Sequence, residues 1–482
     1  MFLTDIMPFK PVILWTDSLV YLLLIVVIIF AWYVRRNEHL LIPWKRVGHS
    51  VSGMMALTVL MLFISIGLLD TVHFRPALEN NNSASIEKIY DVKVLSLFDI
   101  IATPLRTNIE KTYSAPFATH LYSKEIIELP EGGQIREFPR LKFGGSHLQN
   151  PEKQFSTDIA WRTLEGLCLG FSIWVISVTL LVKLIAYKSG MKFMPVLSII
   201  SRGETEIPWK YIFIMAALLL LIFGITLSLS THYHIFGTDK VGQDVFYQAL
   251  KSIRIGLIIG TITTLMMLPF ALILGITAGY FKGWVDDVIQ YIYTTLSSIP
   301  SVLLIAASVL MMQVYIGIHP ELFDTMASRA DLRLLFLCII LGVTSWTGLC
   351  RLLRGETLKI REMEYIQAAH AFGVSHWRII SRHILPNVMH IVLIATVMEF
   401  SGLVLAEAVL SYIGVGVDPS MISFGTMINS ARLEMAREPM VWWALLASFG
   451  FMFTLVLSAN LFADAVQDAF NPRVKTLRLI NS

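Results

Sequence analysis

The chain has 482 residues, of which 55% are hydrophobic and only 15% are charged, and its formal net charge is +3. This composition excludes an ordinary soluble protein, and so small a positive charge, without a basic block, excludes a nucleic-acid-binding protein. The apolar stretches are continuous rather than alternating, so we expect membrane-spanning helices and not a β-barrel.

Nine apolar windows are close to the roughly 20 residues that an α-helix needs to cross about 30 Å of hydrocarbon. They lie at about 18–34, 52–72, 164–187, 209–230, 253–279, 289–315, 333–353, 388–412 and 441–463. The sequence therefore predicts an all-α polytopic membrane protein with nine transmembrane helices. The first window lacks the cleavage site of a secretory signal and is followed by Arg35 and Arg36, so we expect an uncleaved span.

The distribution of Lys and Arg predicts the orientation of these spans, because basic residues concentrate in cytoplasmic connections. Such residues gather between spans one and two, between spans three and four, in the segment 353–387, and near the C-terminus. An odd number of spans then places the N-terminus outside the membrane and the C-terminal tail, 476–482, in the cytoplasm.

The residues between spans two and three, 73–163, lie outside by the same counting, and we expect them to form a small extracytoplasmic domain. Within it, residues 126–129 and 134–138 have the composition of two short strands, and the four residues between them favour a turn. The segment 1–72 then carries two spans, and the segment 164–208 carries a third span and a cytoplasmic loop.

The cytoplasmic connection 356–386 is too long and too regularly patterned for a simple linker. Tyr365 begins a stretch that favours a helix, and Gly373 can supply the left-handed residue that ends it. Ser375 can cap a second helix, and Pro386 suits the start of span eight because a first-turn residue needs no amide donor. We predict a rigid helix–turn–helix that docks in a groove of another protein and transmits rigid-body motion.

The same connection resembles the EAA loop of ABC importer permeases, whose pattern is Glu-Ala-Ala, three residues, Gly, nine residues, Ile, one residue, Leu-Pro. The matching residues are Ala368, Ala369, Gly373, Leu385 and Pro386. Gln367 stands in the place of the family's Glu, which removes a charge that could pair with an Arg of an ATPase, and His383 stands where Ile is common. The resemblance implies that these residues, with Tyr365, couple the chain to an ATPase.

Further motifs resemble the peptide and nickel branch of these permeases, in the family's order. They are Gly237-Thr238-Asp239 with Gly242-Gln243-Asp244, the run 279–286, Ser298-Ile299-Pro300, and the runs 405–408 and 410–416. The resemblance covers roughly 209–475, which implies a six-span permease core, and it leaves 1–208 as an accessory extension.

This resemblance implies a place in a larger assembly at the bacterial inner membrane. The implied partners are a second homologous permease subunit, two cytoplasmic ATPase subunits that hold ATP and Mg²⁺, and an extracytoplasmic substrate-binding protein; membrane lipid surrounds the spans. Dipeptides, oligopeptides, nickel chelates and antimicrobial peptides all remain open as substrates.

The outer loop after span four offers the first candidates for a gate in the pathway: Gly237, Thr238, Asp239, Gly242 and Asp244. Two nearby carboxylates can serve acid/base catalysis, but no nucleophile or cofactor motif accompanies them. We therefore interpret these residues as shaping an outer gate.

Glu399 and Glu407 are expected inside span eight, where a charged side chain is costly unless it faces protein or water. Eight residues make just over two helical turns, so the two carboxylates fall on nearly the same face. They could line a translocation path, or Glu407 could lie near the outer mouth and pair with an Arg. Both interpretations stay open.

Catalysis by this chain is not expected. It lacks the phosphate-binding pattern Gly-x-x-x-x-Gly-Lys-Ser/Thr, so we expect no bound cofactor and no ATPase site. Cys168, Cys338 and Cys350 lack metal-ligand spacing, and the histidines form no metal constellation. The rival interpretation is a secondary transporter that uses Glu399 and Glu407 as ion sites without any ATPase; a receptor component built on 73–163 is a further one.

Overall fold

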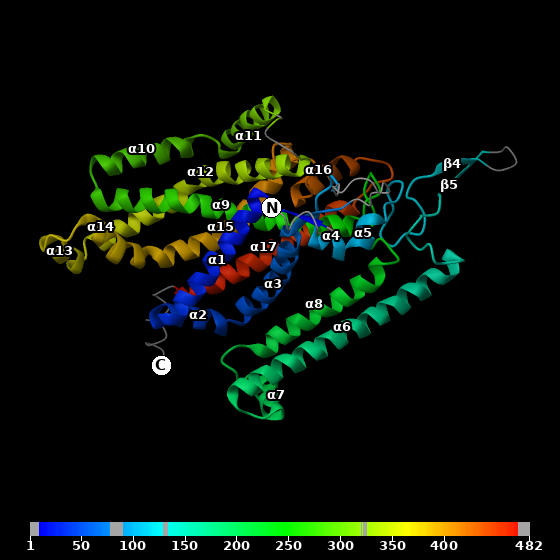
Figure 1. The fold of residues 1–482 in the computed structure, drawn as a ribbon, viewed down its shortest axis with the longest axis horizontal. Coiled ribbons are helices and arrows are strands. Elements are labelled where there is room, and N and C mark those ends of the chain that lie inside the picture. The colour runs from blue at the N-terminus through cyan, green and yellow to red at the C-terminus, as the bar shows by residue number, and fades with distance from the viewer. Residues whose placement is uncertain (1–8, 78–89, 129–133, 320, 322–324, 471–482) are drawn as a thin grey trace, which may run out of the picture. The chain divides into compact units, whose positions relative to one another are not determined.

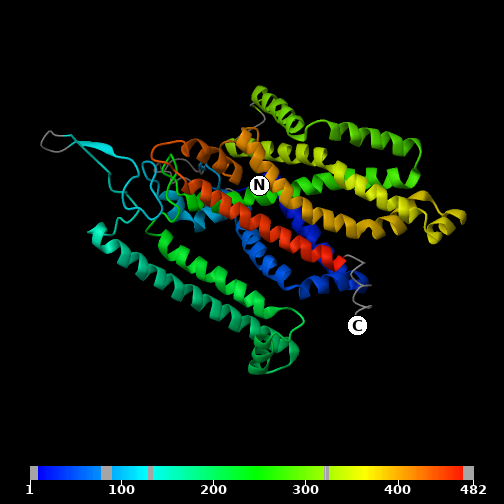
Figure 2. The same ribbon diagram turned by 180° about the vertical axis from the view of Figure 1, so that it is seen from behind.

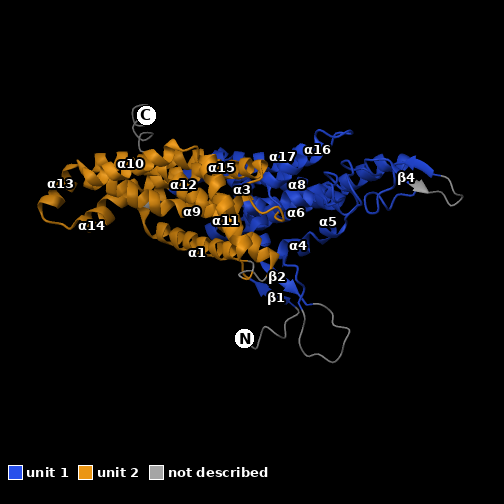
Figure 3. Cartoon of the chain, turned by 90° about the horizontal axis from the view of Figure 1, so that it is seen from above, with its two compact units in different colours: residues 1–12, 44–255, 422–462 blue, residues 13–43, 256–421, 463–482 orange. Residues whose placement is uncertain are grey.

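The computed structural model describes residues 9–77, 90–128, 134–319, 321 and 325–470. These residues are predominantly helical, and nine of the helices they form are long and apolar enough to cross a membrane (Figures 1 and 2). The predicted all-α membrane architecture is confirmed. The chain divides into two compact units, one of residues 1–12, 44–255 and 422–462 and the other of residues 13–43, 256–421 and 463–482 (Figure 3).

The first unit combines long helices with short strands. Its elements are β1 (Phe9–Val12), the second half of α2 (Glu38–His49), α3 (Val51–Thr71), β2 (His73–Pro76), β3 (Leu95–Ser96), α4 (Leu97–Ile101), α5 (Thr103–Thr107), β4 (Glu125–Glu128), β5 (Gln134–Glu137), α6 (Pro151–Ser189), α7 (Phe193–Arg202), α8 (Trp209–Ser230), the start of α9 (Val245–Phe281), α16 (Phe424–Glu434) and most of α17 (Trp443–Phe470). Strands β1, β2 and β3 form an antiparallel sheet in which Val12 pairs with His73. This pairing brings the segment before α1 next to the segment after α3, and the span count places both on the same side of the membrane.

Helices α6 and α8 lie side by side in both views, joined by α7 (Figures 1 and 2). Glycines allow the two backbones to approach, because a Cβ on Gly166, Gly170 or Gly224 would overlap backbone atoms of the facing helix. Helix α6 begins at Pro151 and not at residue 164, so its first turns come from the segment assigned to the outer domain.

The predicted hairpin is confirmed. Strands β4 and β5 pair in antiparallel register, with Ile127 opposite Ile135, and the ribbon projects from the rest of its unit (Figure 1). The predicted turn between them lies in 129–133, outside the described residues. All four side chains of β5 are exposed, so the hairpin buries little apolar surface of its own.

The second unit contains the helices that follow the start of α9. Its elements are α1 (Trp15–Arg36), the first half of α2, most of α9, α10 (Trp284–Ser298), α11 (Ser301–Ile318), α12 (Met326–Arg361), α13 (Glu364–Ala371), α14 (His376–Ile379), the π-helix Ile380–Ile384, α15 (Leu385–Ile413) and the end of α17. Its largest buried apolar cluster draws on α9, α10, α12 and the start of α15. At Gly279 on α9 an added Cβ would lie 2.6 Å from the Cβ of Thr357 on α12, so glycine sets the spacing of these two helices.

The predicted sixth span, 289–315, is wrong as one continuous helix. The chain forms α10 and α11 instead, separated at Ile299 and Pro300. Proline disfavours a helical conformation in the residue before it, and Ile299 is extended with φ −86° and ψ 131°. Only α11 meets the length and composition of a membrane span here, and Trp284–Ser298 does not.

Candidate functional site

Helix α13 lies beyond the ends of α9, α10, α12 and α15 in the second unit (Figures 1 and 2). It ends as the sequence predicts: Gly373 adopts the left-handed conformation with φ +73°, and the Val374 amide donates to the Ala369 carbonyl at 3.1 Å. Ser375 occupies the N-cap position of α14, but its side chain makes no capping hydrogen bond, so the expected side-chain cap is wrong.

The second helix of this segment does not stop before span eight. Residues His376–Ile413 form one continuous helix with a π turn at Ile380–Ile384, in which the Leu385 amide donates to the Ile380 carbonyl. Pro386 is the second residue of α15, where the wider preceding turn accommodates its ring and its missing amide hydrogen. The expectation that span eight starts at Pro386 is therefore corrected, and α14 continues without a break into the span.

Polar contacts fasten this segment to the ends of the neighbouring helices. The Tyr280 hydroxyl lies 2.8 Å from Nδ1 of His376, and the Lys282 ammonium lies 2.6 Å from a carboxylate oxygen of Glu362. The Lys282 charge lowers the pKa of Glu362. In addition, Asn387 Nδ2 donates to the Tyr365 hydroxyl at 3.0 Å, which ties α13 to α15.

Apolar anchors act at the same place. Ile366 on α13, Ile379 on α14 and Ile384 in the π turn are all buried in the cluster that α9, α10 and α12 share. Ala369 packs partly against this cluster, whereas Ala368 is exposed. The segment therefore has one face fixed to the bundle and one face that faces away from it.

The exposed face carries two aromatic residues that the sequence analysis did not select. Phe372 is 86% exposed and Trp377 is 77% exposed, on either side of Gly373. Large aromatic side chains at such exposure are typical of binding surfaces. The signal was present in the sequence as two bulky aromatic residues on either side of a glycine in the connection between spans seven and eight. Gln367 is also exposed, and its side chain donates to the Glu362 carbonyl at 3.1 Å.

A charged pair next to this segment was also missed. Arg354 on α12 donates through Nε and Nη2 to the two carboxylate oxygens of Asp286 on α10, at 2.5 and 2.7 Å. These hydrogen bonds and the charge of Arg354 lower the pKa of Asp286. Arg354 therefore acts as a clamp between α10 and α12.

The predicted outer-gate residues form one tight loop in the first unit. Thr238 Oγ1 donates to the Thr112 carbonyl at 2.8 Å and accepts from the Ser114 amide at 2.7 Å. Gly237 and Gly242 both have positive φ, and a Cβ on Gly242 would overlap the carbonyl oxygen of Glu110. These glycines therefore let the segment that contains Glu110 and Ser114 pack directly on the loop.

The two aspartates of this loop hold backbone and side chains in place. Asp239 Oδ1 accepts from the amides of Val241 and Gln243, at 2.9 and 2.8 Å. Asp244 Oδ1 accepts from the first amides of α9, those of Phe246 and Tyr247. Their role as gate residues stays a proposal, and the contacts show how their positions are fixed.

A buried histidine links this loop to Glu110, which lies between α5 and β4. His234 Nδ1 lies 2.7 Å from Asp244 Oδ2, and its Nε2 lies 3.5 Å from Glu110 Oε1. Burial lowers the pKa of His234, but the two carboxylates outweigh that effect and raise it to about 9. Burial raises the pKa of Glu110, but His234 and three backbone amides hold it down to about 2.

We expect this cluster to make stability depend on pH. His234 titrates near 6.5 in the unfolded chain and near 9 in the folded one, so its contribution is complete below about 6.5 and is lost as the pH rises through 9. The loss is on the order of 2 to 3 kcal/mol. Thermal unfolding of purified protein at pH 6 and pH 9.5 measures it. The variant His234→Gln should lack this part of the pH dependence; an unchanged pH dependence in the variant would contradict the assignment.

The predicted pathway carboxylates lie on α15, eight residues apart. Glu407 is buried and accepts a hydrogen bond from Ser411 Oγ at 2.6 Å, and Glu399 is half-buried. The hydrogen bond to the next helical turn shows how Glu407 is accommodated inside the bundle. Their role in translocation stays a proposal.

Segments that the span count places on one side of the membrane pack together in the first unit. The Tyr122 hydroxyl, between α5 and β4, donates to the Met440 carbonyl at 3.1 Å, and Trp443 Nε1 donates to the Thr238 carbonyl at 3.0 Å. The three connections before α6, after α8 and before α17 therefore meet, as alternating spans require.

In the second unit, too, segments that the span count places on one side of the membrane pack together. The Thr16 amide at the start of α1 donates to Asp331 Oδ2 at 3.2 Å, and Arg333 Nη1 lies 3.1 Å from Asp418 Oδ2. The N-terminus, the connection before α12 and the connection after α15 should all share one side by the span count. The predicted connectivity is therefore self-consistent.

Comparison with known proteins identifies the family. The model of the binding-protein-dependent transport system inner membrane component matches residues 271–476. The oligopeptide transport system permease protein OppC of Mycobacterium tuberculosis (strain ATCC 25618 / H37Rv) is 31% identical over 245 residues, which are 51% of this chain and 78% of that protein.

Two further relatives support the same family assignment. The glutathione transport system permease protein GsiD of Pectobacterium atrosepticum is 32% identical over 243 residues, 50% of this chain and 74% of that protein. The dipeptide transport system permease protein DppC of Bacillus subtilis is 28% identical over 242 residues, 50% of this chain and 69% of that protein. The range that the family model matches includes the α13 segment. The chain is a multi-pass membrane protein that belongs to the family of inner membrane components of binding-protein-dependent transport systems.

Proposed function

We propose that this chain is the permease subunit of an ATP-driven ABC importer that moves di- or oligopeptides across a bacterial inner membrane. Relatives named for oligopeptide, glutathione and dipeptide transport support the substrate class. The observation that carries the proposal is the α13 segment, whose exposed face bears Phe372 and Trp377 while its other face is fixed to the helix bundle.

The mechanism follows from the continuity of this segment with span eight. Two partner ATPases bind ATP and Mg²⁺, and their closure moves α13 as a rigid body. Because α14 runs without a break into α15, and because Tyr280 and Lys282 tie the segment to the end of α9, the motion reaches several spans together. A second, homologous permease completes the pathway, and the protein itself carries out no covalent chemistry.

The orientation and the division into domains belong to the same proposal. The N-terminus and the segment 73–163 lie outside, and the segment 356–386 and the C-terminus lie in the cytoplasm. The core, 209–475, forms the pathway with Glu399, Glu407 and the loop 237–244. The extension 1–208 is accessory, and its outer part helps the substrate-binding protein to dock or to act on the gate.

The β4–β5 hairpin allows this proposed role in docking the substrate-binding protein to be tested. Its removal leaves in place the residues that contact the loop 237–244. Replacement of residues 125–137 by a short Gly-Ser turn removes only the projecting ribbon. We expect lower uptake from a given concentration of binding protein, with unchanged ATPase binding. Unchanged uptake at every binding-protein concentration would contradict the docking role.

Transport by cells that lack this subunit tests the function itself. We expect such cells to lose accumulation of labelled di- or oligopeptide and to regain it with the intact chain. Loss of nickel accumulation alone, or of sensitivity to an antimicrobial peptide alone, would assign a different substrate. Peptide transport by the chain without any ATPase would favour the secondary-transporter alternative that uses Glu399 and Glu407.

A further inference from the structure

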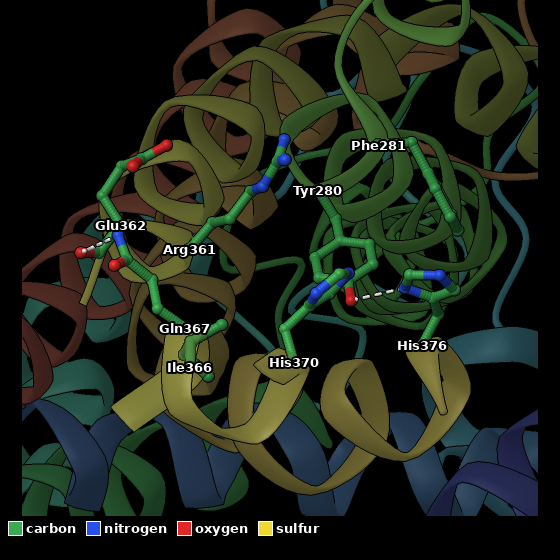
Figure 4. A pocket seen from close by; sticks show the side chains of 8 residues that line it. All are labelled: Tyr280, Phe281, Arg361, Glu362, Ile366, Gln367, His370 and His376. Atoms are coloured by element: carbon green, nitrogen blue, oxygen red, sulfur yellow. Dashed lines mark hydrogen bonds between the residues drawn. The ribbon is translucent and has the colours of Figure 1, made fainter. Parts of the chain in front are cut away.

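A pocket of about 310 Å³ lies between α13 and the ends of α9 and α12 (Figure 4). Its lining includes Tyr280, Arg361, Glu362, Gln367, His370 and His376. Glu362, Gln367, His370 and His376 are exposed to solvent, so the pocket opens to solvent at the edge of α13. It is therefore accessible from outside the protein and is not an internal void.

The charges around this pocket do not cancel. Glu362 is the only carboxylate among its lining residues, and it is already paired with Lys282 at 2.6 Å. The remaining cation is Arg361, whose Nη1 is buried and has no hydrogen-bond partner within the described part of the chain. A buried guanidinium donor without an acceptor is unfavourable, and an anion relieves that cost.

The neighbouring side chains add hydrogen-bond donors rather than negatively charged groups. His376 Nδ1 lies 2.8 Å from the Tyr280 hydroxyl, and the rings of His370 and His376 are 5.4 Å apart. An imidazole held in this way can present its other nitrogen to a ligand. Gln367 is neutral and uses its amide nitrogen on the Glu362 carbonyl, so it supplies no negative charge to Arg361.

We propose that this pocket receives an acidic side chain, Asp or Glu, of the ATPase subunit that docks on α13, with Arg361 as its counter-ion. This inference rests on the proposed function. A side chain of the docked partner is favoured over a free anion because His370 and His376, which line the open pocket, belong to the same segment as the exposed Phe372 and Trp377. Contact with Arg361 would give the docked helix a fixed register.

The test measures binding of the purified ATPase subunit to the detergent-solubilised permease pair. Arg361→Gln removes the charge and is expected to raise Kd roughly tenfold or more and to weaken the salt dependence of binding. Arg361→Lys keeps a charge and should retain part of the affinity. Arg382→Gln is the matched control, because Arg382 is exposed on the same segment and does not line the pocket. Thermal unfolding of each variant reports whether it is folded.

A charge-reversal experiment identifies the partner residue. Arg361→Glu should bind poorly, and one Asp→Arg or Glu→Arg substitution in the ATPase groove should restore binding to that variant alone. If wild-type and Arg361→Gln bind the ATPase equally, the inference is wrong although the proposed function stands. If the wild-type permease pair binds no ATPase, the proposed function itself fails. If inorganic phosphate stabilises the wild-type protein but not Arg361→Gln, the pocket binds a free anion and the inference is overturned.

Discussion

Replacing Phe372 and Trp377 together by alanine is expected to abolish ATP-driven uptake while leaving the permease folded. Both side chains are largely exposed, so their truncation should change the free energy of unfolding by no more than about 0.5 kcal/mol. Exposed aromatic anchors at the centre of an interface typically contribute about 2 kcal/mol or more to binding. We therefore expect the Kd for the ATPase subunit to rise roughly 30-fold or more.

The measurement is binding of the ATPase to the purified permease pair, followed by peptide uptake in reconstituted vesicles. Phe138→Ala is the matched control, because Phe138 is an exposed aromatic residue directly after β5 and does not belong to the α13 segment. It should leave ATPase binding unchanged. Unchanged ATPase binding by the double variant would mean that these rings serve another purpose, such as contact with the membrane interface, and would contradict the docking surface.

Replacing Lys251 by methionine is expected to destabilise the first unit by about 3 kcal/mol. Lys251 Nζ lies 2.5 Å from Asp99 Oδ1 and 3.4 Å from Asp70 Oδ1, and both carboxylates are almost fully buried. Burial raises the pKa of Asp99, but Lys251, Tyr247 and Ser96 outweigh that effect and keep it below its ordinary value. Loss of the ammonium removes the cation that pairs with both of these buried carboxylates.

Thermal or denaturant unfolding of the purified protein measures this loss. Lys240→Met is the matched control, because Lys240 is an exposed lysine of the neighbouring loop, and it should have little effect. Adding Asp70→Asn to Lys251→Met should recover part of the stability by removing one uncompensated charge. Equal stability of Lys251→Met and Lys240→Met would show that the ion pairs of Lys251 contribute nothing to the free energy of unfolding.

The ion pairs of Lys251 with Asp70 and Asp99 bear on how the extension, 1–208, is attached to the core. The sequence presents 1–208 as an accessory addition to the core, and the family model does not include it. In the structure, Asp70 at the end of α3 and Asp99 in α4 bind Lys251 at the start of α9, which belongs to the proposed core. The extension is therefore fastened to the core by buried charges, and its removal would expose them.

Local patterns in the sequence were sufficient for eight of the nine spans and for the end of α13 at Gly373. Hydropathy identifies the spans because lipid requires continuous apolar helices, and Gly373 ends α13 because its left-handed conformation is accessible to glycine. Pro300 interrupts a window that hydropathy alone treats as continuous, since averaging over about 19 residues hides a single break. The π turn before Pro386 has no comparable local signal.

Contacts between distant segments could not be predicted. Arg354 looks like a membrane-surface anchor until α10 places Asp286 beside it, and His234 has no visible role until the fold brings Glu110 and Asp244 to its two nitrogens. Likewise, the pocket behind α13 depends on the meeting of α9, α12 and α14. Sequence patterns identified the residues of the α13 segment. Its anchors, and the Arg361 Nη1 that has no hydrogen-bond partner among the described residues, follow from tertiary structure.

Site-specific cross-linking from α13 tests the central claim most directly. Ala368 is exposed on α13, Cys338 and Cys350 are buried, and Cys168→Ser removes the exposed thiol, so Ala368→Cys provides a single accessible reactive position. In the assembled transporter, a short cross-linker at this cysteine should join the chain to the ATPase subunit, and an impermeant maleimide added outside intact cells should not label it. Labelling from outside, or no cross-link to any nucleotide-hydrolysing subunit, would contradict the account.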